Sequence, residues 1–367
     1  MKKYKVLYID DEISDNSQAF ADGLSRNGLI EITIIKPTNF EELINEIVAG
    51  QTDIDALILD LKLDGNQNGE RTASFTAPSL ATGIKTKYFS DNGITNPFPI
   101  LLISSISNLK KYYDSDTSSH DLFDYTIHKS NIGEDGILYE SLIASLAHAY
   151  KEILDNKRNF NHLLGLDDES KVPNRIFTSK FLTGEGTSIS EISQYIFNEI
   201  ISKSGVLIDE NILAARLGID FINSEEWTSL IEKLDEYKYS GIFKASFKRW
   251  WAHDVLTWWN SNFSKSLIQL TALERVNLIK EKFAFSKLNV AKQIDKTTST
   301  KYWTICQVYQ KPLDPKDGFL VDGYLLNWQD KRYISLESIL ERDAKKKGLL
   351  VHPADKERLE DIKLEYK

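Results

Sequence analysis

Short apolar runs alternate with amphipathic stretches along the first 155 residues. Five runs rich in Val, Ile, Leu and Tyr are continuous, as expected of strands that are covered on both faces. We predict these strands over 5–9, 30–35, 56–59, 99–103 and 125–127. Between them we predict helices over 17–27, 40–49, 79–91, 106–113 and 136–156. Strand–helix alternation of this kind predicts an α/β fold with a doubly wound, five-stranded parallel sheet.

The pattern changes twice along the chain and predicts two domains. The first covers 1–155 and contains a Gly-, Asn- and Thr-rich stretch over 64–78, which we interpret as an inserted surface loop. A polar stretch interrupted by Pro173 predicts a linker over 156–175. The second domain, 176–367, reads as mainly helical to about residue 294 and as mixed α/β after it. In this last part we expect strands over 302–309 and 323–328 and helices over 336–347 and 354–362.

The net charge also differs between the two halves of the chain. The net charge is −9, with 15 Lys and Arg against 27 Asp and Glu in 1–170 and 30 against 27 in 171–367. The first half therefore lacks the basic footprint of a nucleic-acid-binding surface. No apolar run is long enough to span a membrane. The basic start is followed only by the short apolar run 6–9, which predicts a strand rather than a signal peptide, so we expect a cytoplasmic protein. The single cysteine, Cys306, excludes an intramolecular disulfide framework.

Polar side chains follow four of the predicted strands. Asp10 and Asp11 close the first strand, Asp60 the third and Ser104 the fourth, while the fifth runs into Lys129. In a doubly wound sheet the carboxyl ends of the strands surround the ligand site. Three carboxylates within roughly 4–5 Å would repel one another by several kcal/mol, so they require a cation. Oxygen ligands without His or Cys favour Mg²⁺.

Four segments carrying these residues resemble the receiver domain of bacterial two-component response regulators, which has a flavodoxin-like sheet. They are 6–12 (VLYIDDE), 56–65 (ALILDLKLDG), 99–105 (PILLISS) and 124–129 (DYTIHK). The resemblance implies that Asp60 is the phosphoacceptor, that Asp11 ligates Mg²⁺ directly and that Asp10 ligates it through water. It implies that the backbone carbonyl of Lys62 is a further ligand. Ser104 would then move toward the phosphoryl oxygens and Lys129 would pair with them.

The same resemblance implies partners and an output. A histidine kinase would supply the phosphoryl group, and the chain would relay or buffer it in a phosphorelay. The response would be read on the face of the fourth helix, fifth strand and fifth helix, and the fifth helix is also a candidate for a homodimer contact. A receiver with an inserted loop and a non-standard partner domain is similar to those of anti-phage, Detocs-like two-component systems.

The sequence departs from the receiver pattern beside the expected lysine. Ser130 follows Lys129 where the family has proline, and the family's aromatic position holds Thr126, with Tyr125 one residue earlier. Two alternatives to a working receiver therefore stay open. The carboxylates could cap strands in an inert domain, or the domain could be a degenerate receiver that is never phosphorylated.

The second domain contains no catalytic constellation, and three interpretations of its role stay open: a partner-binding domain, an unrecognised enzyme or a DNA-binding output. Residues 210–218 and 225–234 have the outline of a helix-turn-helix, but 219–236 hold six acidic residues and one base, Lys233. That charge disfavours contact with phosphates, so DNA is not an expected partner. A mainly aromatic stripe at helical spacing predicts either the core of this domain or a docking face. It consists of Phe243, Phe247, Trp251, Val255, Trp258 and Trp259, with Trp250 beside it.

Overall fold

The computed structural model describes residues 3–12, 15–65, 74–88, 90, 93–113, 121–156, 159–166 and 187–365. The chain forms two compact units. The first unit consists of Met1–Phe197 and Ser240–Ser246, and the second of Asn198–Tyr239 and Phe247–Lys367. Each is described by itself below.

A parallel sheet of five strands forms the centre of the first unit. The strands are β1 (Tyr4–Ile9), β2 (Ile30–Ile35), β3 (Ala56–Asp60), β4 (Ile100–Ser104) and β5 (Tyr125–His128). Their order across the sheet is β2-β1-β3-β4-β5, and each neighbouring pair is parallel. Every residue of β3 and β4 is buried, because helices cover both faces of these central strands. The predicted flavodoxin-like α/β fold is confirmed.

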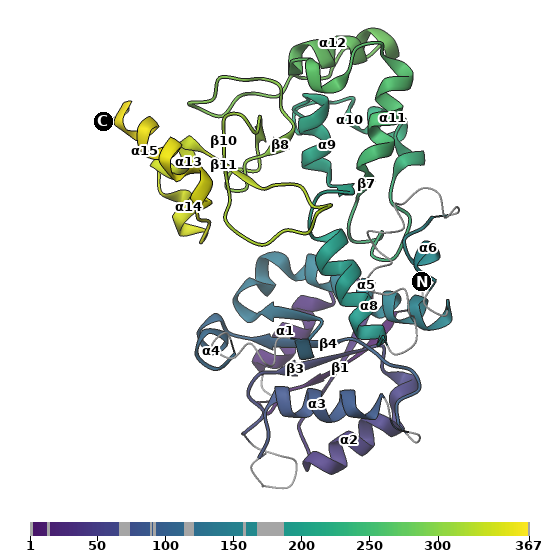
Figure 1. The fold of residues 1–367 in the computed structure, drawn as a ribbon. Helices are drawn as coiled ribbons and strands as arrows, with labels where there is room; N and C mark the ends of the chain where they lie inside the picture. Colours follow the sequence, from purple (N-terminus) through teal and green to yellow (C-terminus); the bar gives the residue numbers. More distant parts are fainter. Residues whose placement is uncertain are drawn as a thin grey trace. The chain divides into compact units, whose positions relative to one another are not determined.

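Helices cover the sheet in two layers (Figure 1). One layer contains α1 (Asp15–Leu24) and α5 (Ile132–Asp155), which contact each other. The other contains α2 (Phe40–Ala49) and α3 (Ala77–Lys87), which also contact each other. Helix α4 (Ile106–Tyr112) follows β4 directly, because the side chain of Ser105 caps it by accepting a hydrogen bond from the Asn108 amide. The sharp start of α4 keeps Ser104 at the very end of its strand.

The first unit extends beyond residue 155, where we predicted its end. It also includes α6 (Phe160–Leu163), α8 (Ile189–Tyr195) and Ser240–Ser246. Helix α8 packs on α5, and its Ser190 and Gln194 lie 3.5 and 3.4 Å from the buried Asp124 carboxylate. These polar contacts explain why α8 belongs to this unit. Of the predicted linker 156–175, only 156 and 159–166 lie within the described residues.

The second unit combines helices with three short antiparallel strand pairs, in agreement with the predicted mixture. After the turn of helix at Ile196–Ile201, its helices are α9 (Glu210–Leu217), α10 (Trp227–Glu232), α11 (Ala252–Asn262), α12 (Ala272–Phe283), α13 (Leu336–Leu340), α14 (Asp343–Lys346) and α15 (Lys356–Glu365). The strand pairs are β6 (Leu207–Ile208) with β7 (Trp250–Trp251), β8 (Thr304–Ile305) with β9 (Pro312–Leu313), and β10 (Gly318–Leu320) with β11 (Tyr333–Ser335). No helix among the residues described is long and apolar enough to cross a bilayer.

Two predictions for the second unit are wrong in detail. The strand predicted over 302–309 is only the two residues of β8, and 323–328 form no strand. The reason for the second error is that β10 pairs with β11, so the intervening segment is the loop that joins them. Gly323 in that loop has φ of +149°, a conformation that L side chains rarely adopt.

The predicted aromatic stripe is not one helix. Helix α11 begins at Ala252, and Trp250 and Trp251 before it form strand β7. Phe243 has φ of +70°, outside the helical region, and packs on Phe197 in the first unit at 5.4 Å between ring centroids. The core of the second unit does contain four of the predicted side chains: Trp250, Val255, Trp258 and Trp259.

Candidate functional site

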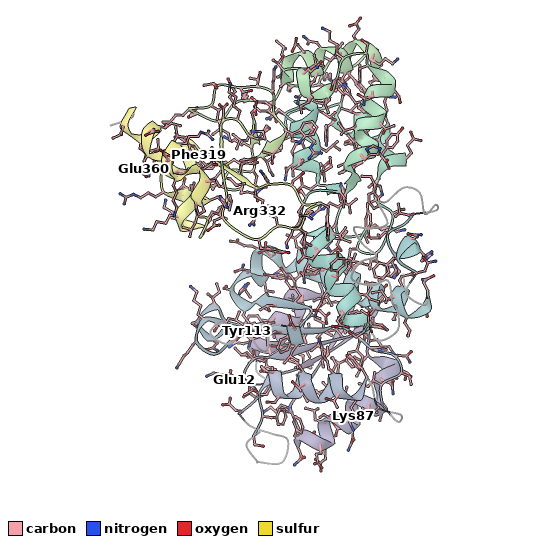
Figure 2. The ribbon with its side chains drawn as sticks, in the orientation of Figure 1. Glu12, Lys87, Tyr113, Phe319, Arg332 and Glu360 are labelled. Carbon is pink, nitrogen blue, oxygen red and sulfur yellow. The ribbon has the colours of Figure 1, made fainter. Side chains whose placement is uncertain are left out.

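Three buried carboxylates meet at the carboxyl edge of the sheet. Asp10 and Asp11 follow β1 and directly precede Glu12, which Figure 2 labels, and Asp60 is the last residue of β3. Since β1 and β3 are parallel neighbours, their ends lie side by side. Oxygen atoms of all three carboxylates lie within 4.8 Å of one another, and the residues are only 1%, 8% and 6% exposed. The structure therefore brings together the acids that the sequence predicted to converge.

Lys129 contributes a positive charge to this cluster. Its Nζ lies 2.6 Å from Oδ1 of Asp60 and 3.9 Å from Oδ2 of Asp10, and it also stands over the ring of Phe20. Three ionised carboxylates and one ammonium sum to a charge of −2. A divalent cation would balance that sum, and three carboxylate groups without a sulfur or imidazole ligand suit Mg²⁺. The residues present therefore fit the metal that the sequence predicted.

Hydrogen bonds fix the orientation of each carboxylate. Asp10 accepts from the Tyr8 hydroxyl at 2.6 Å, from Ser17 Oγ at 2.8 Å and from the Glu12 amide at 2.9 Å. Neither Tyr8 nor Ser17 was among the predicted site residues. Tyr8 could have been found from strand alternation, because residues two apart on a strand point to the same face.

The turn after β3 holds the other two carboxylates. The amide of Gly65 donates to Oδ2 of Asp11 at 2.7 Å, and the amide of Lys62 donates to Oδ2 of Asp60 at 3.1 Å. A Cβ at position 65 would lie 2.1 Å from the same Asp11 oxygen, so this close approach requires glycine. The side chain of Lys62 is exposed, which leaves its backbone as the part that faces Asp60. Of the predicted insertion 64–78, residues 66–73 lie outside the described part of the chain.

Burial changes the acidity of the cluster. It raises the pKa of Asp60 to about 6, even though the neighbouring Lys129 ammonium favours the ionised form. Burial also raises the pKa of Asp11, against the effect of the Gly65 amide. Asp60 is thus mostly ionised at neutral pH, but its charge is poorly compensated by the protein alone.

Ser104 lies at the same edge of the sheet. Asp60 is in register with Ile103 on β4, so Ser104 is one position further along, and it is in register with His128, the residue before Lys129. Ser104 is 1% exposed. Asp60, Ser104 and Lys129 therefore come from the ends of three adjacent strands, as the sequence predicted.

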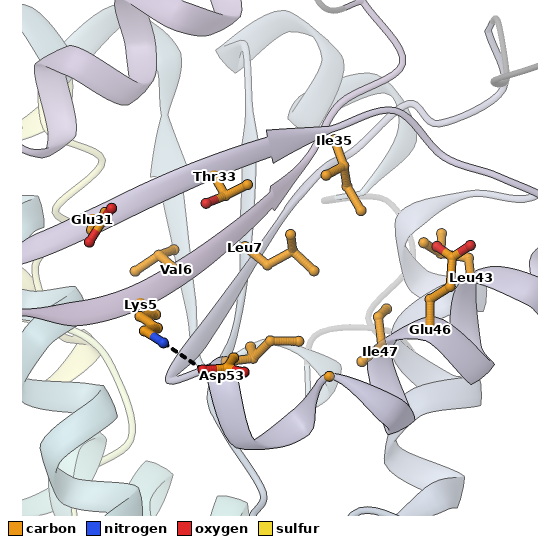
Figure 3. Close-up of a pocket in the computed structure, with 12 residues that line it drawn as sticks. Lys5, Val6, Leu7, Glu31, Thr33, Ile35, Leu43, Glu46, Ile47 and Asp53 are labelled. Atoms are coloured by element: carbon orange, nitrogen blue, oxygen red, sulfur yellow. Dashed lines mark hydrogen bonds and ion pairs between the residues drawn. The ribbon is translucent and has the colours of Figure 1, made fainter.

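Among the pockets that lie apart from this cluster in the described part of the chain, two differ clearly in their lining. One, of about 450 Å³, runs between the β1–β2 edge and α2 in the first unit, and Figure 3 shows its mainly aliphatic lining with the Lys5–Asp53 ion pair at one end. The other, of about 160 Å³, lies in the second unit and is mainly polar. Its lining includes Asp330, which pairs with Arg216 at 2.7 Å, and Arg332, labelled in Figure 2. None of the residues that line this second pocket is a histidine or cysteine.

Comparison with solved structures finds likenesses to receiver domains. A response regulator receiver domain protein from Clostridium thermocellum is 17% identical, covering 42% of this chain and 97% of its own, with a TM-score of 0.26. The signal receiver domain of the putative response regulator NarL from Mycobacterium tuberculosis is 13% identical, covering 36% and 93%, with a TM-score of 0.24. The RcsB response regulator from Salmonella typhimurium is 17% identical, covering 54% and 84%, with a TM-score of 0.27. No protein-family model and no curated protein matches the chain.

Proposed function

We propose that the first unit is a response-regulator-like receiver that accepts a phosphoryl group on Asp60 from a histidine kinase in the cytoplasm. The observation that carries the proposal is the buried cluster of Asp10, Asp11 and Asp60, whose charge of −2 with Lys129 calls for one divalent cation. An inert domain would gain nothing from three such acids at one sheet edge, because uncompensated buried charge is costly.

The residues of the site suit phosphoryl transfer. An oxygen of ionised Asp60 attacks phosphorus while the phosphorus–nitrogen bond of the kinase phosphohistidine breaks. The released electron pair stays on the imidazole nitrogen, which takes up a proton from solvent. A bound Mg²⁺, held by Asp11, Asp60 and the Lys62 carbonyl and through water by Asp10, would neutralise charge on the phosphoryl oxygens. Lys129 would pair with the same oxygens, and Ser104 would donate a hydrogen bond to them.

The output is proposed to run through the α4–β5–α5 face to a partner-binding second unit. Tyr125 on β5 supports this route, because its ring packs on Tyr139 of α5 at 6.2 Å and on Phe197 at 6.1 Å. Phe197 follows α8 and is the last residue of this stretch of the first unit. A change at the β5 edge would therefore reach the segment that leads into the second unit. Exposed Ile137 and Leu138 on α5 would suit a contact with a second copy of the chain.

Phosphorylation of the full chain tests the proposal. We expect acetyl phosphate with Mg²⁺ to add one phosphoryl group by intact mass spectrometry, and chelation of the metal to prevent it. Asp60→Asn should abolish the gain, whereas Asp64→Asn, an exposed acid four residues later, should leave it intact. An unmodified wild-type chain would demote the domain to a degenerate receiver, and modification that survives Asp60→Asn would place the acceptor elsewhere.

A second candidate function is favoured by the polar pocket of the second unit. Its lining includes Asp330, which pairs with Arg216, and burial raises the pKa of Asp330 and lowers that of Arg216. Perturbed groups in a polar pocket are a feature of enzymes. Hydrogen exchange with a beryllofluoride mimic on Asp60 separates a relayed switch from phosphoryl buffering. Protection changes in residues 198–239 or 247–365 would support a relayed switch, and changes confined to the first unit would favour phosphoryl buffering.

A further inference from the structure

Tyr8 is a fully buried tyrosine near the carboxyl end of β1, and its hydroxyl reaches the acidic cluster. It lies two residues before Asp10 and so points to the same face of the strand. Its side chain is 0% exposed, and its hydroxyl lies 2.6 Å from Oδ2 of Asp10. The phenol is the partner with a hydrogen in this contact, so its hydroxyl donates to the carboxylate.

The two oxygens of Asp10 are unequally occupied. Oδ2 accepts from both Tyr8 and Ser17, which uses the two lone pairs that a carboxylate oxygen offers. Oδ1 accepts only from the Glu12 amide among the hydrogen bonds of the described residues. The protein thus engages one oxygen of Asp10 fully and leaves the other with spare capacity. Asp11 differs, since its Oδ2 accepts from the Gly65 amide and from no side chain in the same described set.

We propose that Tyr8 is a positioning residue that sets the metal preference of the site, an inference that rests on the proposed binding of Mg²⁺. By occupying Oδ2 together with Ser17, Tyr8 keeps Asp10 from becoming a bidentate ligand. A carboxylate held in this way contacts the cation through its water shell. Mg²⁺ keeps several of its waters in proteins, whereas Ca²⁺ takes six to eight oxygen ligands and readily accepts bidentate carboxylates. Tyr8 therefore favours the smaller, hydrated ion.

Tyr8→Phe tests this role by removing one oxygen atom and little volume. Calorimetric titration of the unphosphorylated full chain with Mg²⁺ and, separately, with Ca²⁺ gives the ratio of the two affinities. Loss of an outer-shell partner of a metal ligand costs on the order of tenfold in affinity. We expect Mg²⁺ affinity to fall by roughly tenfold and Ca²⁺ affinity to fall less or to rise, so that the ratio shifts toward Ca²⁺. Ser17→Ala frees the same oxygen and should shift the ratio in the same direction.

Tyr150→Phe is the matched control. Tyr150 is another buried tyrosine of the first unit, and its hydroxyl donates to the Asp124 carboxylate at 2.8 Å, outside the acidic cluster. A general loss of packing would change the ratio of Mg²⁺ to Ca²⁺ affinity in both Tyr8→Phe and Tyr150→Phe. A positioning role would change this ratio in Tyr8→Phe alone. An unchanged ratio in Tyr8→Phe and Ser17→Ala, with Mg²⁺ still bound by the wild type, would overturn the role of Tyr8 and leave the proposed function standing. A wild-type chain that binds no Mg²⁺ at millimolar concentration would overturn both. If Tyr8→Phe does not fold by circular dichroism, Ser17→Ala decides the question.

Discussion

Both units of the chain bury charged side chains, but they compensate the charge in different ways. In the first unit, Asp10, Asp11 and Asp60 meet one ammonium, and the sum is negative. In the second unit, the guanidinium of Arg275 is 0% exposed and is surrounded by backbone carbonyls. It donates to the carbonyls of Leu267, Arg216 and Tyr302 at 2.7–3.1 Å.

The comparison separates a site from a structural element. Arg216, also buried, donates to the carbonyl of Trp303, stands over the same indole ring and pairs with Asp330. The donors of Arg216 are thus largely matched within the protein, whereas Nη2 of Arg275 has no hydrogen-bond partner among the described residues. At the acidic cluster the charges are not matched, and a ligand would have to supply the compensating charge of +2. Buried charge that the chain leaves uncompensated is therefore the better indicator of function.

Removal of Arg275 should give the largest effect. We expect Arg275→Met to destabilise the second unit by about 3–5 kcal/mol, because three carbonyls that the guanidinium satisfies would be left buried. All seven tryptophans of the chain lie in this unit, so tryptophan fluorescence during urea unfolding reports on it. Arg275→Lys, with fewer donors, should lose an intermediate amount. A loss below about 1 kcal/mol in Arg275→Met would mean that the carbonyls find other partners, and the contrast between the units would fail.

Removal of a charge from the acidic cluster should increase stability rather than decrease it. Without metal, Asp60→Asn should stabilise the first unit at neutral pH. The pKa of Asp60 is raised in the folded chain to about 6 from an ordinary 3.8, so the folded state binds its proton more tightly than the unfolded state. The stability that this proton provides is present below about pH 4 and is lost as the pH rises through 6. At pH 7 the advantage of Asp60→Asn over the wild type should be about 2–3 kcal/mol larger than at pH 4.

Chemical denaturation of the two proteins in parallel, followed by far-ultraviolet circular dichroism in the presence of a chelator, measures this difference. Saturating Mg²⁺ should reduce it, because a bound cation stabilises the ionised wild-type site and not the variant to the same degree. A difference that stays constant from pH 4 to 7 would show that the carboxylate is compensated by the protein itself.

The sequence was sufficient to predict the acidic site, because its geometry follows from the sheet. Parallel strands end at one edge, so Asp60 and Asp10 had to meet once β1 and β3 were recognised as buried runs. Tyr8 was assigned to a strand by its apolar neighbours, and that assignment is right. Its bond to Asp10 was missed because apolar periodicity predicts burial and carries no information about where a hydroxyl points.

Contacts between distant segments were the part that the sequence could not provide. The spacing from Phe243 to Trp251 is helical, yet Trp250 and Trp251 pair with Ile208 and Leu207, more than forty residues earlier. That pairing, together with the positive φ of Phe243, overrides the local pattern. The first unit reaches past residue 155 for a similar reason, since Ser190 and Gln194 of α8 contact Asp124 of that unit across about seventy residues.

The smallest effect concerns the capping of α8, and it tests whether this helix belongs with the first unit. Ser188 and Glu191 form a capping box, in which each side chain bonds to the backbone amide of the other. Ser188→Ala should cost about 1 kcal/mol. Hydrogen exchange should become faster in α8 and at the β5 edge near Asp124, with no change in the second unit. Thr271→Ala removes the cap of the corresponding box in α12 and is the control: it should loosen α12 and leave α8 unchanged. If Ser188→Ala instead accelerates exchange mainly in residues 207–283, α8 is coupled to the second unit. The boundary between the unit with uncompensated buried charge and the unit with compensated buried charge would then lie before α8.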